Sequence, residues 1–194
     1  SLITGKIQTI HGMHAVRAAL SNTKRVHHEL HVTENNREFA KNYKSAIKKI
    51  TILDQKDFKK LYGSEKSTQG IVLKTKDFER PSLEQFLKNE NFNNRSVVVA
   101  LDQITDPQNI GSIMRSCALF NCKGILIAKD NSPDLTPSLY KAASGAAEIV
   151  NYFRVTNLKR SISELKKYGY WAYGFDSSEN QKSYNLNFSK KSIL

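Results

Sequence analysis

The first 77 residues switch repeatedly between the two spacings that apolar side chains adopt in helices and strands. Met13, Val16 and Leu20 recur at helical spacing, whereas the segment VHHELHV at 26–32 alternates as a strand does. The same patterns continue and predict helices over 12–20, 36–49 and 56–62 and strands over 26–32, 50–53 and 71–74. Short alternating elements of both kinds predict a small α/β domain over residues 1–77.

From residue 95 onward the apolar positions form short continuous runs. Residues 97–101 (VVVAL) are mostly β-branched, which is typical of parallel strands buried on both faces. The pattern predicts further strands over 124–128, 152–155, 170–175 and 192–194, helices over 110–120 and 158–168, and a helix capped by Thr136 with Pro137 in its first turn. This alternation predicts an open parallel sheet over 95–194 that binds ligands beyond the carboxyl ends of its strands.

A polar tract separates the two predicted domains. Residues 78–94 contain Pro81 and several asparagines, which interrupt regular structure, although a short helix over 82–87 fits within the tract. We therefore expect a linker over 78–94.

Charge adds the first indication of a partner. The chain has 30 Lys and Arg against 18 Asp and Glu, a formal net charge of +12, and such an excess attracts polyanions over long range. Nucleic acid is the expected partner, while a basic surface that serves only solubility is the alternative.

Composition excludes some other classes. The sequence has no apolar run near the ~18 residues that a membrane span needs, so we expect no membrane insertion. Residues 1–10 do not resemble a secretory signal, and the two cysteines, Cys117 and Cys122, are expected to be reduced. These observations favour a cytoplasmic protein.

The segment LDQITDPQNIGSIMRSC at 101–117 carries the most chemical information. Asn109 is placed to cap the helix that follows, and Arg115 falls on the side of that helix shared with Gly111 and Ser112. The opposite, buried stripe is expected to contain Ile110, Ile113, Met114, Cys117 and Phe120. Because Gly111 and Ser112 are small, a phosphate could approach closely, which indicates an anion site; a surface ion pair of Arg115 fits the spacing equally well.

Other motifs are less informative. The five histidines (His11, His14, His27, His28 and His31) lack a nearby cysteine pair or carboxylate at ligand spacing, so we predict RNA contact by one or two of them rather than metal binding. No glycine-rich phosphate loop follows residues 97–101, which disfavours a dinucleotide-binding enzyme.

Several segments resemble the SpoU, or TrmH-like, family of RNA 2′-O-ribose methyltransferases. The run DQITDPQNIGSIMRSCALFNCKGILIAKD resembles the first conserved motif of that family, and KAASGAAEIVNYFRVTN resembles the segment that follows in its ribosomal-RNA branch. IHGMHAVRAAL and TQGIVLKTK are similar to the two ends of the small RNA-binding domain of that branch, which methylates a guanosine ribose in 23S ribosomal RNA.

The resemblance implies S-adenosylmethionine-dependent methyl transfer to a ribose 2′-hydroxyl of structured large-subunit RNA, by a homodimer with an α/β-knot (SPOUT-type) catalytic domain. It assigns Asn109 and Arg115 to the catalytic site, with Glu148 as a candidate to position Arg115 by an ion pair; an exposed helix-end carboxylate fits Glu148 equally well. The cofactor would approach Gly174, Phe175 and Asp176. RNA contacts fall on His14, Arg17, Gln69, Gly70 and Lys141.

The sequence departs from the family pattern at two places. The second and third motifs, a Gly-x-Glu loop and a Ser-Leu-Asn segment, would lie after Leu194, so the knot is expected to be incomplete and the cofactor to bind this chain poorly. Thr68 stands where the branch usually has histidine. The alternatives are a non-catalytic RNA-binding protein on the same scaffold and an enzyme that acts on tRNA.

Overall fold

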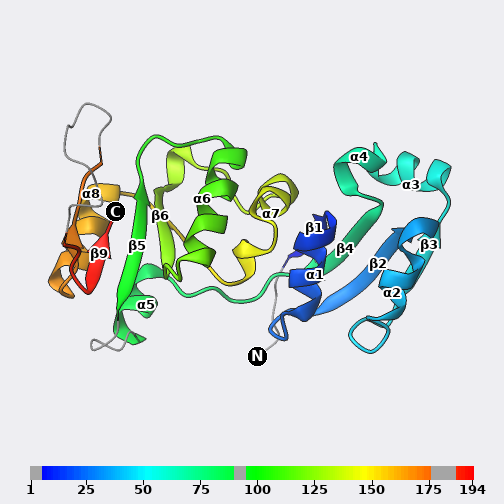
Figure 1. Ribbon diagram of the computed structural model, residues 1–194, viewed down its shortest axis with the longest axis horizontal. Coiled ribbons are helices and arrows are strands. Elements are labelled where there is room, and N and C mark those ends of the chain that lie inside the picture. Colours follow the sequence, from blue (N-terminus) through cyan, green and yellow to red (C-terminus); the bar gives the residue numbers. More distant parts are fainter. Residues whose placement is uncertain (1–5, 90–94, 176–186) are drawn as a thin grey trace.

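The chain builds two sheets that lie side by side along the long axis of the molecule (Figure 1). The computed structural model describes residues 6–89, 95–175 and 187–194. We call residues 6–77, which contain the first sheet, the first lobe, and the described part of residues 95–194, which contains the second sheet, the second lobe.

The first sheet is mixed. Its strands are β1 (Ile7–His11), β2 (His27–Thr33), β3 (Ile50–Leu53) and β4 (Ile71–Lys76), in the order β1-β4-β2-β3. Strand β4 is antiparallel to β1 and β2, and β3 is parallel to β2. The first lobe also contains α1 (Met13–Ser21), η1 (Glu34–Asn36), α2 (Arg37–Lys41), α3 (Gln55–Tyr62) and α4 (Glu65–Thr68). The predicted α/β class is confirmed, although the pattern missed β1.

The second sheet is parallel throughout, as predicted. Its order is β7-β6-β5-β9-β8, with β5 (Ser96–Leu101), β6 (Gly124–Ala128), β7 (Asn151–Val155), β8 (Trp171–Ala172) and β9 (Lys191–Ile193). The accompanying helices are α5 (Leu83–Asn89), α6 (Pro107–Leu119), η2 (Lys129–Asn131), α7 (Pro137–Ala143), η3 (Ala146–Glu148) and α8 (Leu158–Lys167).

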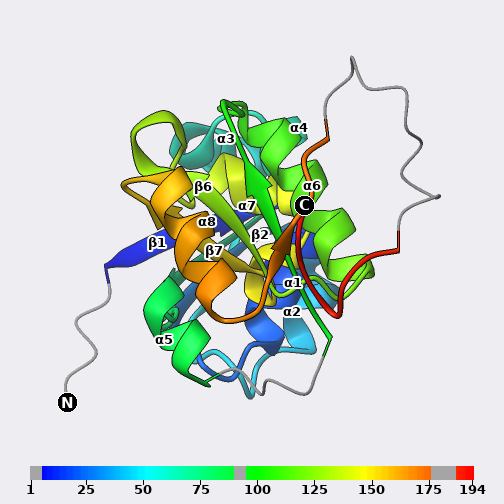
Figure 2. The ribbon, with the colours of Figure 1, turned by 90° about the vertical axis from the view of Figure 1, so that its left-hand side faces the viewer.

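Helices cover both faces of the second sheet (Figure 2). Ile125 of β6 joins an apolar cluster with Met114 of α6. The next residue, Leu126, joins a separate cluster with Leu87 of α5 and Leu165 of α8. Since alternate residues of a strand point to opposite faces, burial on both sides explains why these strands read as continuous apolar runs.

The two lobes share one apolar core. Ile10 of β1 and Val16 of α1 belong to the same buried cluster as Leu139, Tyr140 and other residues of α7. Figure 1 shows α7 next to β1, between the two sheets. The lobes are therefore packed together, and they are not separate bodies joined only by a linker.

The predicted helix over 36–49 is wrong in its second half. Helix α2 ends at Lys41, and Asn42 and Tyr43 donate to carbonyls three residues back, which tightens the chain into turns. This turn brings Ile47 into the core at 2% exposure. Continuing the helix would also have placed Lys44 and Lys48 one turn apart, where like charges repel.

Candidate functional site

Helix α6 begins three residues earlier than the pattern predicts. Asp106 is the N-cap and accepts a hydrogen bond from the Gln108 amide at 3.1 Å, and Pro107 occupies the first helical position. Proline suits that position because its fixed φ is helical and its missing N–H is not needed there. The prediction that Asn109 caps the helix is therefore wrong, and Asn109 lies exposed within the first turn.

One face of α6 packs closely on α7. A Cβ atom added at Gly111 would lie 2.5 Å from Cβ of Ala142, so Gly111 permits two helices to approach and is not open to a phosphate. Ile110, Met114 and Cys117 are buried as expected. Phe120 was predicted to belong to this stripe, but it is 75% exposed because α6 has ended at Leu119 and the chain turns away.

Arg115 lies on the outer side of α6, in a groove between the lobes. This junction groove has a volume of about 790 Å³ and is formed by the end of α1 and the loop after it, by α6, and by the turn from α7 to η3. The lining residues used below are Ala18, Asn22, Lys24, Arg115, Leu119, Gly145, Glu148 and Ile149. Arg115 is exposed and makes no hydrogen bond or ion pair with any residue that the structure describes. Its guanidinium can therefore bind an anion that enters the groove.

Glu148 does not pair with Arg115, which corrects the expectation from the resemblance. Its two carboxylate oxygens accept from Nε and Nη2 of Arg25 at 2.8 and 2.9 Å, and one also accepts from Asn22 at 2.7 Å. The Glu148 side chain is 4% exposed, so it is not an exposed helix-end carboxylate either. Burial by itself would lower the pKa of Arg25, but the hydrogen bond and charge of Glu148 raise it above its ordinary value.

Sequence reasoning missed Arg25 entirely. Arg25 lies in a loop, and its partner Glu148 is 123 residues away along the chain. The spacing of residues within one segment therefore cannot predict this contact.

Three of the predicted RNA-contact residues gather at the start of α1. His14, Gln69 and Lys141 line a small cavity of about 90 Å³ beside Gly12. Gln69 Oε1 accepts from the Met13 amide at 2.7 Å and so caps α1 from another segment. Burial and the charge of Lys141 lower the pKa of His11, which favours the neutral form of its imidazole.

The other two predicted RNA-contact residues lie apart from this cavity. Arg17 is exposed on α1, with its guanidinium 5.7 Å from the ring centroid of Phe39. Gly70 is buried, and its carbonyl accepts from the Thr33 amide at 2.9 Å.

Thr68 takes part in the same turn. It is 3% exposed, its hydroxyl accepts from the Gly70 amide at 3.3 Å, and its carbonyl accepts from the Gly12 amide at 3.2 Å. These contacts make Thr68 a structural residue that joins the start of α1 to the start of β4.

The predicted cofactor residues follow β8. A Cβ atom at Gly174 would have no described neighbour within 4 Å, and Phe175 is 55% exposed, with its ring centroid 6.4 Å from that of Phe188. Asp176 lies outside the described residues. The predicted strand over 170–175 is shorter than expected, since β8 contains only Trp171 and Ala172.

Two further kinds of feature are absent from the part of the chain that the structure describes. Within residues 6–89, 95–175 and 187–194, no helix is long and apolar enough to cross a membrane. Over the same ranges, no three His, Cys, Asp or Glu side chains come together as metal ligands do.

Comparison with known proteins assigns both lobes. Residues 96–194 match the model of the SpoU rRNA Methylase family, and residues 9–81 match the model described as RNA 2′-O ribose methyltransferase substrate binding. The chain is 32% identical over 177 residues to the 23S rRNA (guanosine-2′-O-)-methyltransferase RlmB of Coxiella burnetii, an alignment that covers 87% of this chain and 69% of that protein.

Further similarities extend this result. RlmB of Neisseria meningitidis is 40% identical over 98 residues, which cover 50% of this chain but only 39% of that protein. The crystal structure of the SpoU methyltransferase AviRb from Streptomyces viridochromogenes in complex with AdoMet superposes with a TM-score of 0.73 at 15% identity, covering 97% of this chain and 72% of that one. At that identity the superposition shows a shared fold.

Proposed function

Because the chain belongs to the SpoU rRNA methylase family, we propose that it transfers the methyl group of S-adenosylmethionine to a ribose 2′-hydroxyl of ribosomal RNA. The observation that carries this proposal is the unpaired Arg115 in the junction groove, since a cation without a partner among the described residues is available to a ribose oxygen and its phosphate.

The chemistry requires such a cation. A neutral ribose hydroxyl is a poor nucleophile. As its oxygen bonds to the methyl carbon, its proton passes to an acceptor, a role that we assign to the neighbouring RNA phosphate, and the sulfur of the donor would leave as a neutral thioether. The guanidinium of Arg115 stabilises the negative charge that develops on the 2′-oxygen, and every ~1.4 kcal/mol of selective stabilisation raises the rate tenfold. Asn109 lies in the first turn of the same helix and does not line the junction groove. We assign it to the catalytic site as a second polar side chain, because it belongs to the segment that resembles the family motif.

S-adenosylmethionine supplies an electrophilic methyl group when it is bound. The residues after β8 fit the adenosine part in one respect, because Gly174 leaves open space and Phe175 exposes an aromatic face. We assign Gly174 and Phe175 to that contact; neither residue lines the junction groove, since Phe175 lies beside Phe188, which lines a different pocket.

RNA binding is assigned to residues 1–77, with a linker over 78–94 and catalysis in 95–194. The match of residues 9–81 to a substrate-binding model supports this division. His14, Arg17 and Gln69 of the first lobe offer side chains to the RNA, and the buried Gly70 holds the turn that presents Gln69. Lys141 of the second lobe, whose ammonium also donates to the Ser67 carbonyl, joins them at the start of α1. With ribosomal RNA as its substrate, the protein would act in the cytoplasm.

A homodimer completes the proposal. Leu119 and Ile149, which are 79% and 72% exposed, both line the junction groove, and Phe120, which follows Leu119 in the chain, is 75% exposed. Large apolar side chains exposed together are typical of a protein interface. We infer that a second copy packs against these side chains at one edge of the junction groove and leaves Arg115 accessible to RNA.

The function is tested by incubating the protein, as its gene encodes it, with labelled S-adenosylmethionine and unmodified 23S ribosomal RNA. Nuclease digestion of the product should release one 2′-O-methylated nucleoside. Labelling of tRNA instead would contradict the ribosomal substrate, and RNA binding without methyl transfer would contradict the enzymatic proposal and favour a non-catalytic RNA-binding protein.

A further inference from the structure

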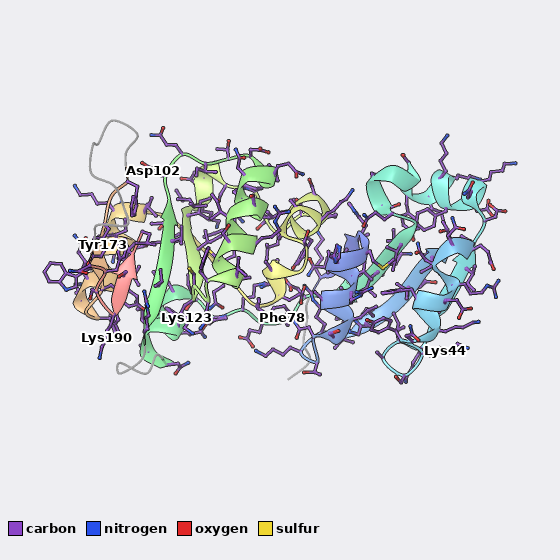
Figure 3. The ribbon with its side chains drawn as sticks, in the orientation of Figure 1. Lys44, Phe78, Asp102, Lys123, Tyr173 and Lys190 are labelled. Atoms are coloured by element: carbon purple, nitrogen blue, oxygen red, sulfur yellow. The ribbon has the colours of Figure 1, made fainter. Side chains whose placement is uncertain are left out.

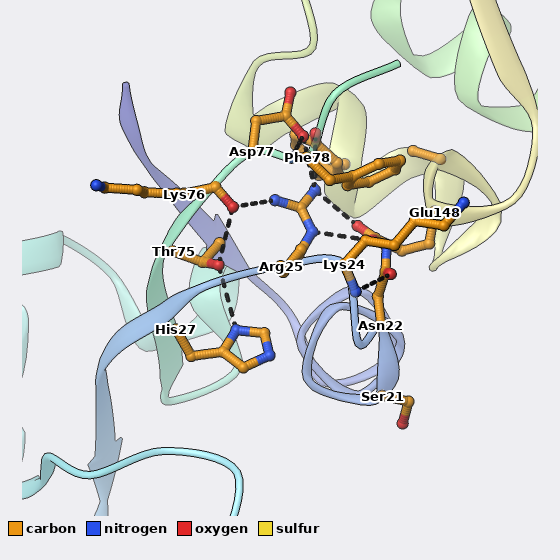
Figure 4. A network of polar contacts seen from close by, with 12 residues as sticks. Ser21, Asn22, Lys24, Arg25, His27, Thr75, Lys76, Asp77, Phe78 and Glu148 are labelled. Carbon is orange, nitrogen blue, oxygen red and sulfur yellow. Dashed lines mark hydrogen bonds and ion pairs between the residues drawn. The ribbon is translucent and has the colours of Figure 1, made fainter. Parts of the chain in front are cut away.

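A buried polar network joins the two lobes beneath the junction groove (Figure 4). At its centre the Arg25 side chain, which is 0% exposed, forms a two-point ion pair with Glu148. The Nη1 atom of Arg25 also donates to the Lys76 carbonyl at 3.1 Å, and Nη2 donates to the Tyr140 hydroxyl at 3.0 Å. Arg25 therefore forms hydrogen bonds with the end of β4 in its own lobe and with Tyr140 and Glu148 in the second lobe.

The segment between the lobes takes part in the same network. Arg80 donates to the Ala147 carbonyl at 2.7 Å and to the Tyr140 hydroxyl at 3.1 Å. The ring of Phe78 contacts both guanidiniums, with its centroid 5.1 Å from Cζ of Arg25 and 4.1 Å from Cζ of Arg80. Stacking of this kind on an aromatic face holds a guanidinium in a defined orientation.

Geometry distinguishes this network from the apolar contact around it. Apolar burial is not directional, so the shared core alone would tolerate several orientations of one lobe on the other. A two-point Arg–carboxylate pair accepts only a narrow range of angles and distances. Removing Arg25 leaves Glu148 as an uncompensated buried charge, and removing Glu148 leaves Arg25 with only the more exposed Asp77, 3.4 Å away, as a charged partner. Both changes make a rearranged junction unfavourable.

The network also forms part of the groove in which Arg115 lies. Asn22 of the first lobe and Glu148 of the second both line the groove, and they are hydrogen-bonded to each other. On the same side, a Cβ atom at Gly145 would lie 2.7 Å from Cβ of Ala18, so the two walls are in close contact. A change in the orientation of the lobes must change the shape of this groove.

We propose that Arg25 and Glu148 are positioning residues, whose buried ion pair holds the RNA-binding lobe at the orientation that lets bound RNA reach Arg115. The expected change in KM rests on the proposed function, whereas the expected change in the orientation of the lobes rests on the contacts described above. Neither residue is assigned a contact with the reacting atoms. When the pair is broken, the lobes sample several orientations, and RNA binds productively to only a fraction of the molecules.

The test compares Glu148→Gln and Arg25→Lys with wild type. Each variant removes the two-point charged pair and keeps a polar side chain of similar length. Glu84→Gln is the matched control, because Glu84 forms an exposed ion pair with Lys88 on α5, away from the junction. If a tenth of the molecules keep the competent orientation, the KM for RNA rises about tenfold while kcat stays within about twofold.

A structural readout accompanies the kinetics. Hydrogen exchange at the amides of α1 and of residues 145–150 should accelerate in both variants and stay unchanged in the control, since exchange reports local opening. Unchanged exchange, or a fall in kcat at constant KM, would overturn the proposal. If Glu148→Gln does not fold, Asn22→Ala replaces it, because this variant removes one hydrogen bond to Glu148. We then expect the same changes in KM and in hydrogen exchange, at smaller size.

A further variant leaves every charge in place. Gly145→Ala should press Cβ against Ala18 and strain a backbone with φ of +94°, so it should reproduce the rise in KM. A normal KM in a folded Gly145→Ala protein with altered exchange would overturn the link between orientation and RNA binding. Wild-type protein that fails to methylate RNA contradicts the proposed function alone, because the exchange experiment still tests the ion pair.

Discussion

Two arginines illustrate how differently a charged residue can be used in one molecule. Arg25 is fully buried, with its charge balanced and its donors bonded across the junction. Arg115 is exposed in the groove above it, without a partner among the described residues. A buried, paired cation stabilises the packing of the two lobes, whereas an exposed, unpaired cation can bind a ligand. The contacts of each arginine therefore indicate which of these two roles it has.

Glu29 gives a test of electrostatics in the first lobe. A hydrogen bond from Lys49, reinforced by His31 and opposed by burial, lowers the pKa of Glu29 to about 2 from 4.5. A carboxyl whose pKa is depressed by folding adds stability above its unfolded pKa and loses it as the pH falls through the folded pKa. Glu29→Gln should therefore cost about 1–2 kcal/mol at pH 7, a value reduced by the exposure of Lys49.

Urea unfolding at several pH values checks this prediction. The difference between wild type and Glu29→Gln should shrink as the pH falls from about 5 to 2. A difference that is constant over this range would show that the charge of Glu29 does not matter.

Cys117 provides a test of burial on α6. Burial, together with the neighbouring Cys122, raises the pKa of the Cys117 thiol to about 12, and the residue is 2% exposed. Because only the thiolate reacts at a useful rate, Cys117 should resist a maleimide at pH 7.5 until the protein is unfolded in urea. Mass spectrometry of the labelled peptides identifies the modified position, and rapid labelling of Cys117 in the folded protein would contradict the packing of α6.

The positions of site residues could be predicted from the sequence only where the spacing of residues along one helix determines which side of the helix they occupy. Helical phase was sufficient to place Arg115 off the buried stripe of α6 and Cys117 on it. The role expected for Glu148 was wrong because its partner lies in the other lobe. The prediction that Asn109 caps α6 fails because Pro107 suits the first helical position, which makes the preceding Asp106 the N-cap.

At the scale of elements, tertiary contacts determine those helix and strand boundaries that the sequence pattern does not predict. The strands buried on both faces were predicted within one or two residues, since a short run of β-branched apolar residues rarely forms anything but a buried strand. The helix predicted over 36–49 failed because its lysine-rich second half turns to bury Ile47. Spacing along one segment does not contain that tertiary contact.

The close contact of α6 and α7 can be tested at Gly111. Gly111→Ala would place Cβ 2.5 Å from Ala142 and within 3 Å of its backbone, so the helices must move apart. We expect a loss of about 1–2 kcal/mol, because the strain of overpacking exceeds the helix propensity gained. Ser112→Ala, an exposed change on the same helix, is the control. Urea unfolding measures both, and a Gly111→Ala protein as stable as wild type would contradict the packing.

The whole molecule carries its positive charge over both lobes. Figure 3 shows Lys44 at the far end of the first lobe and Lys190 at the far end of the second. With a net charge of +12, RNA binding should release counterions from every phosphate that is contacted. The logarithm of the association constant should fall linearly with the logarithm of salt concentration, with a slope of about −0.7 for each phosphate contacted on a single strand. Fluorescence anisotropy with a labelled fragment of 23S ribosomal RNA measures the slope, and affinity independent of salt would contradict the electrostatic role of the surface.

The proposed reaction depends most on Arg115, and the initial rate of RNA methyl transfer by Arg115→Ala tests it most directly. Arg160→Ala, which removes an exposed arginine of α8, is the matched control. Loss of one group that stabilises developing charge typically lowers kcat by about 100-fold to 1,000-fold, so the rate should fall by at least about 100-fold in Arg115→Ala and stay near wild type in Arg160→Ala, with unfolding midpoints unchanged. Near-normal turnover by folded Arg115→Ala protein would contradict the assignment of the junction groove as the active site.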